Sequence, residues 1–180
     1  EGFTFTGDEA SGIRSVYVTA TMIEDETITA SAQITLYRED EAVFDYTYRF
    51  DGATINAENI LVTEEEIAEA YEAVDPKLLD VIRKALVNIR NYHAKQRQVS
   101  WFDSQENGII LGQKVTPLKT VGVYVPGGKA VYPSSVLMNI LPAKVAGVDE
   151  IVMVTPPGKD GKVNPNTLVA AKEAGAGFSC

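Results

Sequence analysis

The sequence predicts an α/β fold in which N-terminal helices lead into an incomplete parallel sheet. The main observation is the stretch VGVYVPGGKAVYPSSVLMNILPAKVAGVDEIVMVTPP at 121–157. It contains an apolar strand, a Pro-Gly-Gly turn, an amphipathic segment and a second apolar strand, the order typical of a βαβ unit. A second observation is a pair of helix-start signals upstream, TEEE at 63–66 and Asp75-Pro76.

The Pro-Gly-Gly turn is the first candidate for a functional site. Gly127 and Gly128 follow the strand Val121–Val125 closely, and glycine allows positive φ and lets backbone N–H groups approach a ligand. Open α/β sheets bind ligands at the carboxyl ends of their strands, where this turn and the loop Thr155-Pro156-Pro157 both fall. We expect the two loops to be neighbours. An ordinary turn needs the same residues, and the spacing is not that of the G-x-G-x-x-G fingerprint.

Composition excludes several classes of protein. The 180 residues are 45% hydrophobic, which suits a globular domain with a sizeable core. The net charge of −9, with scattered lysines and arginines, argues against nucleic acid and anionic membranes as partners. Cys180 is the only cysteine, so we expect no internal disulfide, no CxxC zinc site and a reducing, cytoplasmic setting. The chain does not begin with Met, from which we expect a fragment or a processed product.

A hairpin and a helix are expected at the start of the chain. The segments VYVTATMIE and TITASAQITLY alternate apolar and polar residues on either side of Glu24-Asp25-Glu26, which predicts a hairpin. Ala42, Val43, Tyr46 and Phe50 recur at helical spacing, so we expect a helix over 39–50 that ends at Asp51-Gly52 and packs these residues into a core.

Two further helices are expected next. The TEEE motif predicts a capping box between Thr63 and Glu66, and Asp75-Pro76 predicts a longer helix that ends near Gln98. The apolar positions of the two helices should be buried; they are Ile67, Ala70, Tyr71, Val74, Leu78, Leu79, Ile82, Ala85, Leu86, Ile89 and Tyr92. Beyond them, residues 101–108 should form a loop, and Ile109–Leu111 a strand beside Val121–Val125.

Few side chains outside the turn have a pattern that indicates chemistry. His93 is the only histidine, and since no orienting carboxylate or partner ligand is indicated, a structural role is favoured. Ser134 or Ser135 should cap the helix after the turn, because no base accompanies them as nucleophiles. Lys129, Lys159 and Lys162 could each hold a phosphate or be solvated.

Three runs of this sequence resemble histidinol dehydrogenase. They are EDEAVFDYTYRFDG at 39–52, EEEIAEAYEAVDPKLLDVIRKALVNIRNYHAKQ at 64–96, and GQKVTPLKT…VTPPGKDGK at 112–162. The resemblance covers about residues 38–176 in family order. It implies a Rossmann-like parallel sheet of the histidinol dehydrogenase/aldehyde dehydrogenase type. It also implies a cytoplasmic homodimer in the full-length family that oxidises L-histidinol to L-histidine in two NAD-dependent steps of histidine biosynthesis, with zinc and a Glu-His pair.

The resemblance also indicates site residues. In the family motif VGxYxPGG the tyrosine contacts NAD, and here it is Tyr124; the backbone of Gly127 and Gly128 would lie beside the cofactor. The family's zinc ligands and catalytic pair match no position of this chain, so no catalytic or metal residue is assigned. We therefore expect a chain that is inactive alone. The alternative is a stand-alone nucleotide-binding or interaction module without catalysis.

The resemblance divides the chain in two. Residues 38–180 would be part of the NAD-binding domain, and residues 1–37 an atypical N-terminal segment where the family has helices. A divergent terminus, a fused foreign segment and an out-of-frame segment all remain open for residues 1–37.

Overall fold

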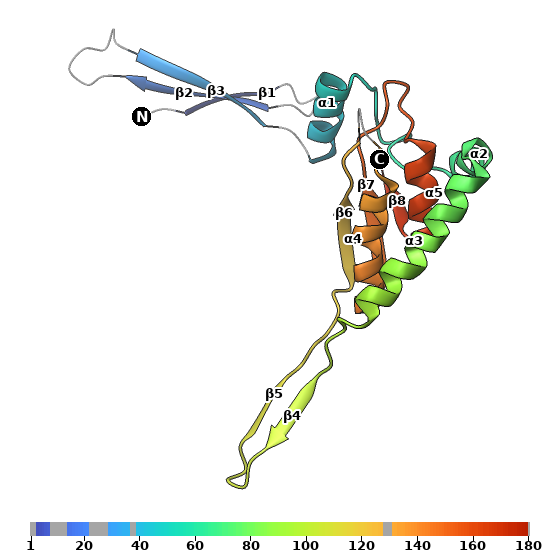
Figure 1. Cartoon of the computed structure of the whole chain (residues 1–180). Coiled ribbons are helices and arrows are strands. Elements are labelled where there is room, and N and C mark those ends of the chain that lie inside the picture. Colours follow the sequence, from blue (N-terminus) through green and yellow to red (C-terminus); the bar gives the residue numbers. More distant parts are fainter. Residues whose placement is uncertain (1–2, 8–13, 22–28, 37–38, 128–130, 180) are drawn as a thin grey trace. The chain divides into compact units, whose positions relative to one another are not determined.

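The computed structural model describes residues 3–7, 14–21, 29–36, 39–127 and 131–179 (Figure 1). These residues belong to two compact units, Glu1–Ala57 and Glu58–Cys180.

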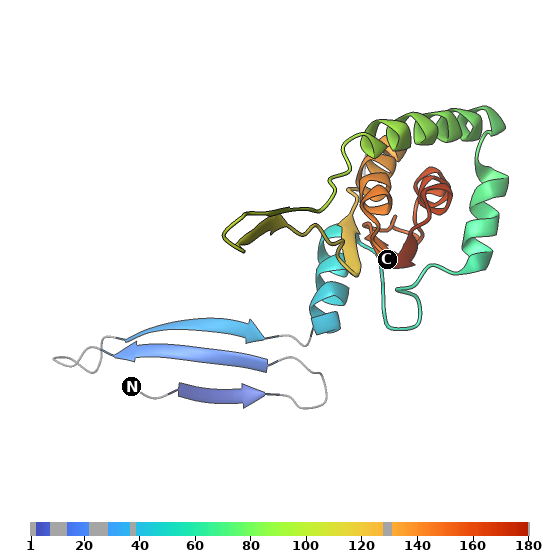
Figure 2. The ribbon, with the colours of Figure 1, turned by 90° about the horizontal axis from the view of Figure 1, so that it is seen from below.

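The first unit contains a three-stranded antiparallel sheet. Its strands are β1 (Phe3–Gly7), β2 (Arg14–Thr21) and β3 (Thr29–Leu36), in the order β1-β2-β3 (Figure 2). Arg14 lies opposite Leu36 and Thr21 opposite Thr29, so the predicted hairpin is confirmed in the described residues. Glu24-Asp25-Glu26 lies outside them. Strand β1 was not predicted, and the helices implied by the resemblance are strands here.

Helix α1 (Glu39–Asp51) completes this unit and ends where predicted. Gly52 follows it with a φ of 70°, and its N–H donates to the Tyr48 carbonyl at 3.2 Å. The expected core packing of its apolar face is wrong, because Val43, Tyr46 and Phe50 are exposed. Tyr46 and Phe50 stack on each other instead, with ring centroids 5.8 Å apart. Both buried apolar clusters of the described residues lie in the second unit, so helical spacing alone did not provide a core here.

The second unit begins with α2 (Glu64–Ala73) and α3 (Pro76–Ala94). The predicted capping box is present: the Glu66 N–H donates to Thr63 Oγ1 at 3.2 Å, and the Thr63 N–H donates to the Glu66 carboxylate at 2.9 Å. The Asp75 carboxylate caps α3 by accepting from the Lys77 N–H at 2.8 Å. Helix α3 ends at Ala94 instead of Gln98, and Tyr92 is exposed instead of buried.

A parallel sheet forms the centre of this unit. Its strands β6 (Thr120–Tyr124), β7 (Glu150–Val154) and β8 (Gly177–Ser179) lie in the order β6-β7-β8. Helix α4 (Pro133–Ala146) joins β6 to β7 and continues through Pro142, and α5 (Pro165–Ala174) joins β7 to β8. The predicted βαβ unit and parallel sheet are therefore confirmed, with Tyr124 opposite Val154 in the register.

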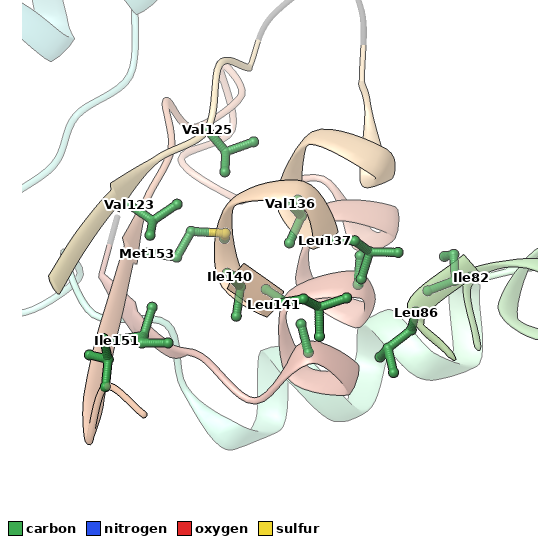
Figure 3. Close-up of a cluster of buried hydrophobic side chains, with 14 residues drawn as sticks. Ile82, Leu86, Val123, Val125, Val136, Leu137, Ile140, Leu141, Ile151 and Met153 are labelled. Atoms are coloured by element: carbon green, nitrogen blue, oxygen red, sulfur yellow. The ribbon is translucent and has the colours of Figure 1, made fainter. Parts of the chain in front are cut away.

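The core lies between one face of this sheet and the helices (Figure 3). Val123, Val125, Ile151 and Met153 alternate along β6, β7 and the residue after β6, and their side chains meet those of α4 and α3. The helix residues are Val136, Leu137, Ile140, Leu141, Ile82 and Leu86. The other face of β6 carries Gly122 and Tyr124, which are exposed.

A two-stranded hairpin replaces the loop expected at residues 101–108. Strands β4 (Trp101–Ser104) and β5 (Ile110–Gln113) are antiparallel, and every residue in them is exposed. The expected pairing of Ile109–Leu111 with β6 is wrong, since β5 pairs with β4. The turn explains this, because the Gln105 N–H donates to the Ile109 carbonyl at 2.8 Å and Gly108 has a φ of 84°. Among the described residues, no helix has the length and apolar character needed to cross a membrane.

Candidate functional site

The loops after β6 and β7 meet at the carboxyl edge of the parallel sheet. The Val125 N–H donates to the Val154 carbonyl at 2.9 Å, which carries the strand pairing into both loops. A Cβ atom added to Gly127 would lie 2.9 Å from the Pro156 carbonyl oxygen and 3.5 Å from Thr155 Oγ1. The expectation that the two loops are neighbours is therefore confirmed.

This contact changes the reason for a glycine at position 127. Positive φ and close approach of a ligand were the expected reasons for both glycines of the turn. Gly127 does not have a positive φ, and the space left by its missing side chain faces the Pro156 backbone. Gly127 thus allows the two loops to touch. Gly128 and Lys129 lie outside the described residues.

A cavity of about 370 Å³ lies at this edge of the sheet. Its volume is within the range of ordinary small-molecule sites. The lining comes from the loops after β6 and β7 and the first turn of α5, and its polar members include Thr155, Asp160, Lys162, Asn164 and Thr167. Thr155 and Thr167 are buried, so part of the polar lining is shielded from solvent.

Tyr124 is placed differently from Gly127. It is the last residue of β6, its side chain is 64% exposed, and it lies on the sheet face opposite Val123 and Val125. Tyr124 does not line the cavity, whereas Gly127 does. The structure therefore brings Tyr124 and Gly127 to the same strand end but not into the same cavity.

The start of α4 has no side-chain cap. Tyr132 is the N-cap residue and makes no capping hydrogen bond, and Pro133 is the first helical residue. The predicted capping by Ser134 or Ser135 is wrong, because proline favours the first helical position and places both serines inside the first turn. By contrast, Asn164 Oδ1 caps α5 by accepting from the Asn166 N–H at 2.9 Å. At the start of α4, Pro133 has no N–H group and the Ser135 N–H donates to the Tyr132 carbonyl at 2.9 Å, so this helix start offers few N–H groups to an anion.

Lys162 forms an ion pair across this unit. Its Nζ lies 3.1 Å from Glu69 Oε2 of α2, and this hydrogen bond raises the pKa of Lys162 above its usual value. Both side chains are exposed. Two roles were left open for Lys162, a phosphate ligand and a solvated group. The structure shows a third, because its ammonium donates a hydrogen bond to the Glu69 carboxylate.

His93 lies in a different part of the unit. Its Nδ1 is 2.7 Å from Gln96 Oε1, and its ring is edge-on to Tyr92. It lines a second cavity, of about 320 Å³, together with Arg97, Pro117 and Pro142. Within the described residues, no group of three or more His, Cys, Asp and Glu side chains could hold a metal ion. This arrangement offers neither a zinc site nor a Glu-His pair at His93.

Thr155 and Asp160 were not predicted as individual site residues. Thr155 comes directly after a buried apolar strand, and Asp160 lies in the GKDG turn of the loop that Thr155 begins. The rule that ligands bind beyond the carboxyl ends of strands could have indicated both. Their separation in sequence from Gly127 concealed the cavity that they share.

The fold and this edge define an α/β protein with a candidate ligand site at the carboxyl ends of a parallel sheet. The sequence model described as histidinol dehydrogenase matches residues 23–177. The chain therefore belongs to the histidinol dehydrogenase family. The match begins upstream of residue 38, where the resemblance was expected to begin.

Individual relatives agree with this membership. The chain is 62% identical to histidinol dehydrogenase of Heliobacterium mobile over 75% of its own length and 32% of the relative. It is 49% identical to that of Bacillus subtilis (strain 168) over 96% of its length and 40% of the relative. The crystal structure of histidinol dehydrogenase from Elizabethkingia anophelis matches with a TM-score of 0.71 at 33% identity, over 78% of this chain and 32% of that one. The chain thus spans 32% and 40% of the two relatives.

Proposed function

We propose that this chain contributes the NAD-binding edge of a histidinol dehydrogenase, an enzyme that oxidises L-histidinol through an aldehyde to L-histidine. The observation that carries the proposal is the contact of Gly127 with the loop after β7, beside a cavity at the carboxyl edge of the sheet. In α/β folds this edge is where dinucleotides bind. Residues 38–180 would form the part of the NAD-binding domain present here, and residues 1–37 a segment outside it.

The chemistry of this edge fits NAD. The cavity has the size and the polar lining that a nucleoside needs. Gly127 and Gly128 would lie against the cofactor with their backbone. The exposed ring of Tyr124 would contact the part of the cofactor that extends beyond the cavity. Bound NAD would supply the hydride acceptor.

The complete reaction needs more than the described residues offer. They do not fit a zinc ion, because no suitable cluster of ligands is present among them. Hydride transfer also requires both substrates at contact distance, and small misplacements lower the rate greatly. We propose that this chain alone does not oxidise histidinol, and that zinc, the proton-transferring pair and the homodimer belong to the complete enzyme.

Binding of NAD to this chain tests the proposal. We expect measurable binding by isothermal titration calorimetry at millimolar NAD. The variant Tyr124→Ala should weaken it about fivefold to tenfold, the effect of one lost aromatic contact. Tyr92→Ala is the matched control, since Tyr92 is equally exposed but lies on α3. Absence of binding would favour a non-catalytic interaction module, and histidinol-dependent NADH formation by this chain would contradict its proposed inactivity.

A further inference from the structure

We infer that Asp160 and the Glu69–Lys162 ion pair select NAD over its 2′-phosphorylated form, NADP. Asp160 would accept a hydrogen bond from the adenosine ribose, and Glu69 would keep the Lys162 ammonium from a 2′-phosphate. The inference rests on the proposed function and extends it to specificity.

The position of the cavity identifies the adenosine side of the site. The cavity lies between the loops that follow β6 and β7, the first two strands in the order β6-β7-β8. In dinucleotide-binding sheets the pyrophosphate lies at the first strand-to-helix turn. The ribose of the adenosine half then contacts residues beyond the second strand, usually through an Asp or Glu.

The second strand of this sheet has no acid at its end. β7 ends at Val154 and is followed by Thr155-Pro156-Pro157, and Thr155 is buried. Among the described residues that line the cavity, Asp160 is the one carboxylate. Asp160 would therefore bind the ribose, as the Asp or Glu at the end of the second strand does in other dinucleotide-binding sheets.

The loop that carries Asp160 is held by its own hydrogen bonds. The Gly158 N–H donates to the Lys162 carbonyl at 2.8 Å, and the Gly161 N–H donates to the Gly158 carbonyl at 2.9 Å. Asp160 Oδ1 accepts from the Lys162 N–H at 3.1 Å. A Cβ atom on Gly158 would lie 2.7 Å from Asp160 Oδ1, so a glycine there makes room for the carboxylate. One oxygen is thus fixed by the loop, and Oδ2 can accept from a ribose hydroxyl.

Lys162 is the group that would otherwise favour NADP. It lines the same cavity, and a lysine ammonium is a suitable partner for a phosphate. Its Nζ is instead 3.1 Å from Glu69 Oε2 on α2. The pairing with Glu69 competes with a 2′-phosphate for the Lys162 ammonium, and the Asp160 carboxylate in the cavity lining attracts hydroxyl donors and repels a 2′-phosphate.

The test compares NAD and NADP as titrants of the whole chain by isothermal titration calorimetry. We expect the unmodified chain to prefer NAD. Asp160→Asn keeps the Oδ1 acceptor of the loop but removes the charge, and should reduce the NAD-to-NADP preference about tenfold. Glu69→Gln should strengthen NADP binding severalfold and leave NAD binding unchanged. Asp149→Asn is the matched control, because it removes the same charge just before β7, at the other end of that strand.

The outcomes separate the two proposals. If the unmodified chain binds neither dinucleotide, the proposed function and the inference both fail. If it binds NAD but neither variant changes the preference, only the inference is overturned. If Asp160→Asn lowers the urea midpoint of unfolding, its effect on binding could come from a disturbed loop. The NADP affinity of Glu69→Gln then decides the inference alone, since Glu69 is an exposed residue of α2 outside the loop.

Discussion

Gly127 is the residue on which the geometry of the carboxyl edge depends most directly. A methyl group there would meet the Pro156 carbonyl oxygen, a backbone atom that cannot move without the loop. We expect Gly127→Ala to lower the free energy of unfolding by about 1–3 kcal/mol, as overpacking does elsewhere. Gly122→Ala is the control, because nothing lies within 4 Å of a Cβ at that strand position. Urea unfolding of both variants would show the difference, and equal midpoints would refute the steric role.

Tyr71, Arg83 and Glu173 join three helices of the second unit, α2, α3 and α5. The Tyr71 hydroxyl donates to Glu173 Oε1 at 2.8 Å, and Arg83 donates to both carboxylate oxygens of Glu173. Arg83 lowers the pKa of Glu173, chiefly through its hydrogen bonds. Burial, with the hydrogen bond to Glu173, raises the pKa of Tyr71 from 10.0 to about 12. Both shifts favour the protonation states in which the contact forms.

These shifts predict an alkaline loss of stability. A raised folded-state pKa means that the neutral Tyr71 stabilises the fold fully below pH 10, and that this contribution is lost as the pH rises toward about 12. Tyr71→Phe should cost about 1 kcal/mol near neutral pH, for one lost hydrogen bond, and should reduce the loss above pH 10. Urea midpoints measured across pH test this. If the stability of Tyr71→Phe fell above pH 10 as steeply as that of a Tyr92→Phe control, the role of Tyr71 would be refuted.

Residue-level prediction succeeded where the signal was local. The capping box at Thr63 and Glu66 formed because both partners lie within one turn of the helix. It failed for Ser134 and Ser135, where the neighbouring Pro133 determined the first helical residue. It also failed for Phe50, which has the spacing of a core residue but is 79% exposed. Spacing shows which side chains share a face, not whether a partner covers that face.

At the scale of elements, the two caps allow a direct comparison. Thr63→Ala removes one half of the capping box of α2 and should cost about 1 kcal/mol of stability. Ser134→Ala, in the first turn of α4, should cost less than about 0.5 kcal/mol, since no side chain caps that helix. Urea unfolding of the two variants measures both values. A larger cost for Ser134→Ala would restore the capping role that the structure denies to it.

Strands were easier to predict than their partners. The pattern of Ile109–Leu111 correctly indicated a strand, but the turn over 105–108 pairs it with β4 instead of β6. In the first unit, alternation predicted the β2–β3 hairpin, whereas β1 was missed. The period of the hydrophobic residues indicates whether a segment is a helix or a strand. Which strands pair depends on the turns and on contacts between residues distant in sequence.

At the scale of the whole molecule, the parallel sheet followed from the order of its strands and crossover helix. The 121–157 stretch contains both strands, the connecting helix and the turn, so its topology could be deduced without the rest of the chain. The cavity could not, because Gly127, Asp160 and Thr167 meet only after α5 packs beside α4. Prediction of the site was thus limited to the strand end that begins it.

The account depends most on NAD binding at this edge, and the most direct test is a ¹⁵N-labelled NMR titration of the chain with NAD. We predict that the amide signals of Gly127, Thr155 and Asp160 shift together with one dissociation constant, while those of β4 and β5 do not move. Shifts confined to the cavity of His93, or to the β4–β5 hairpin, would contradict the proposed site.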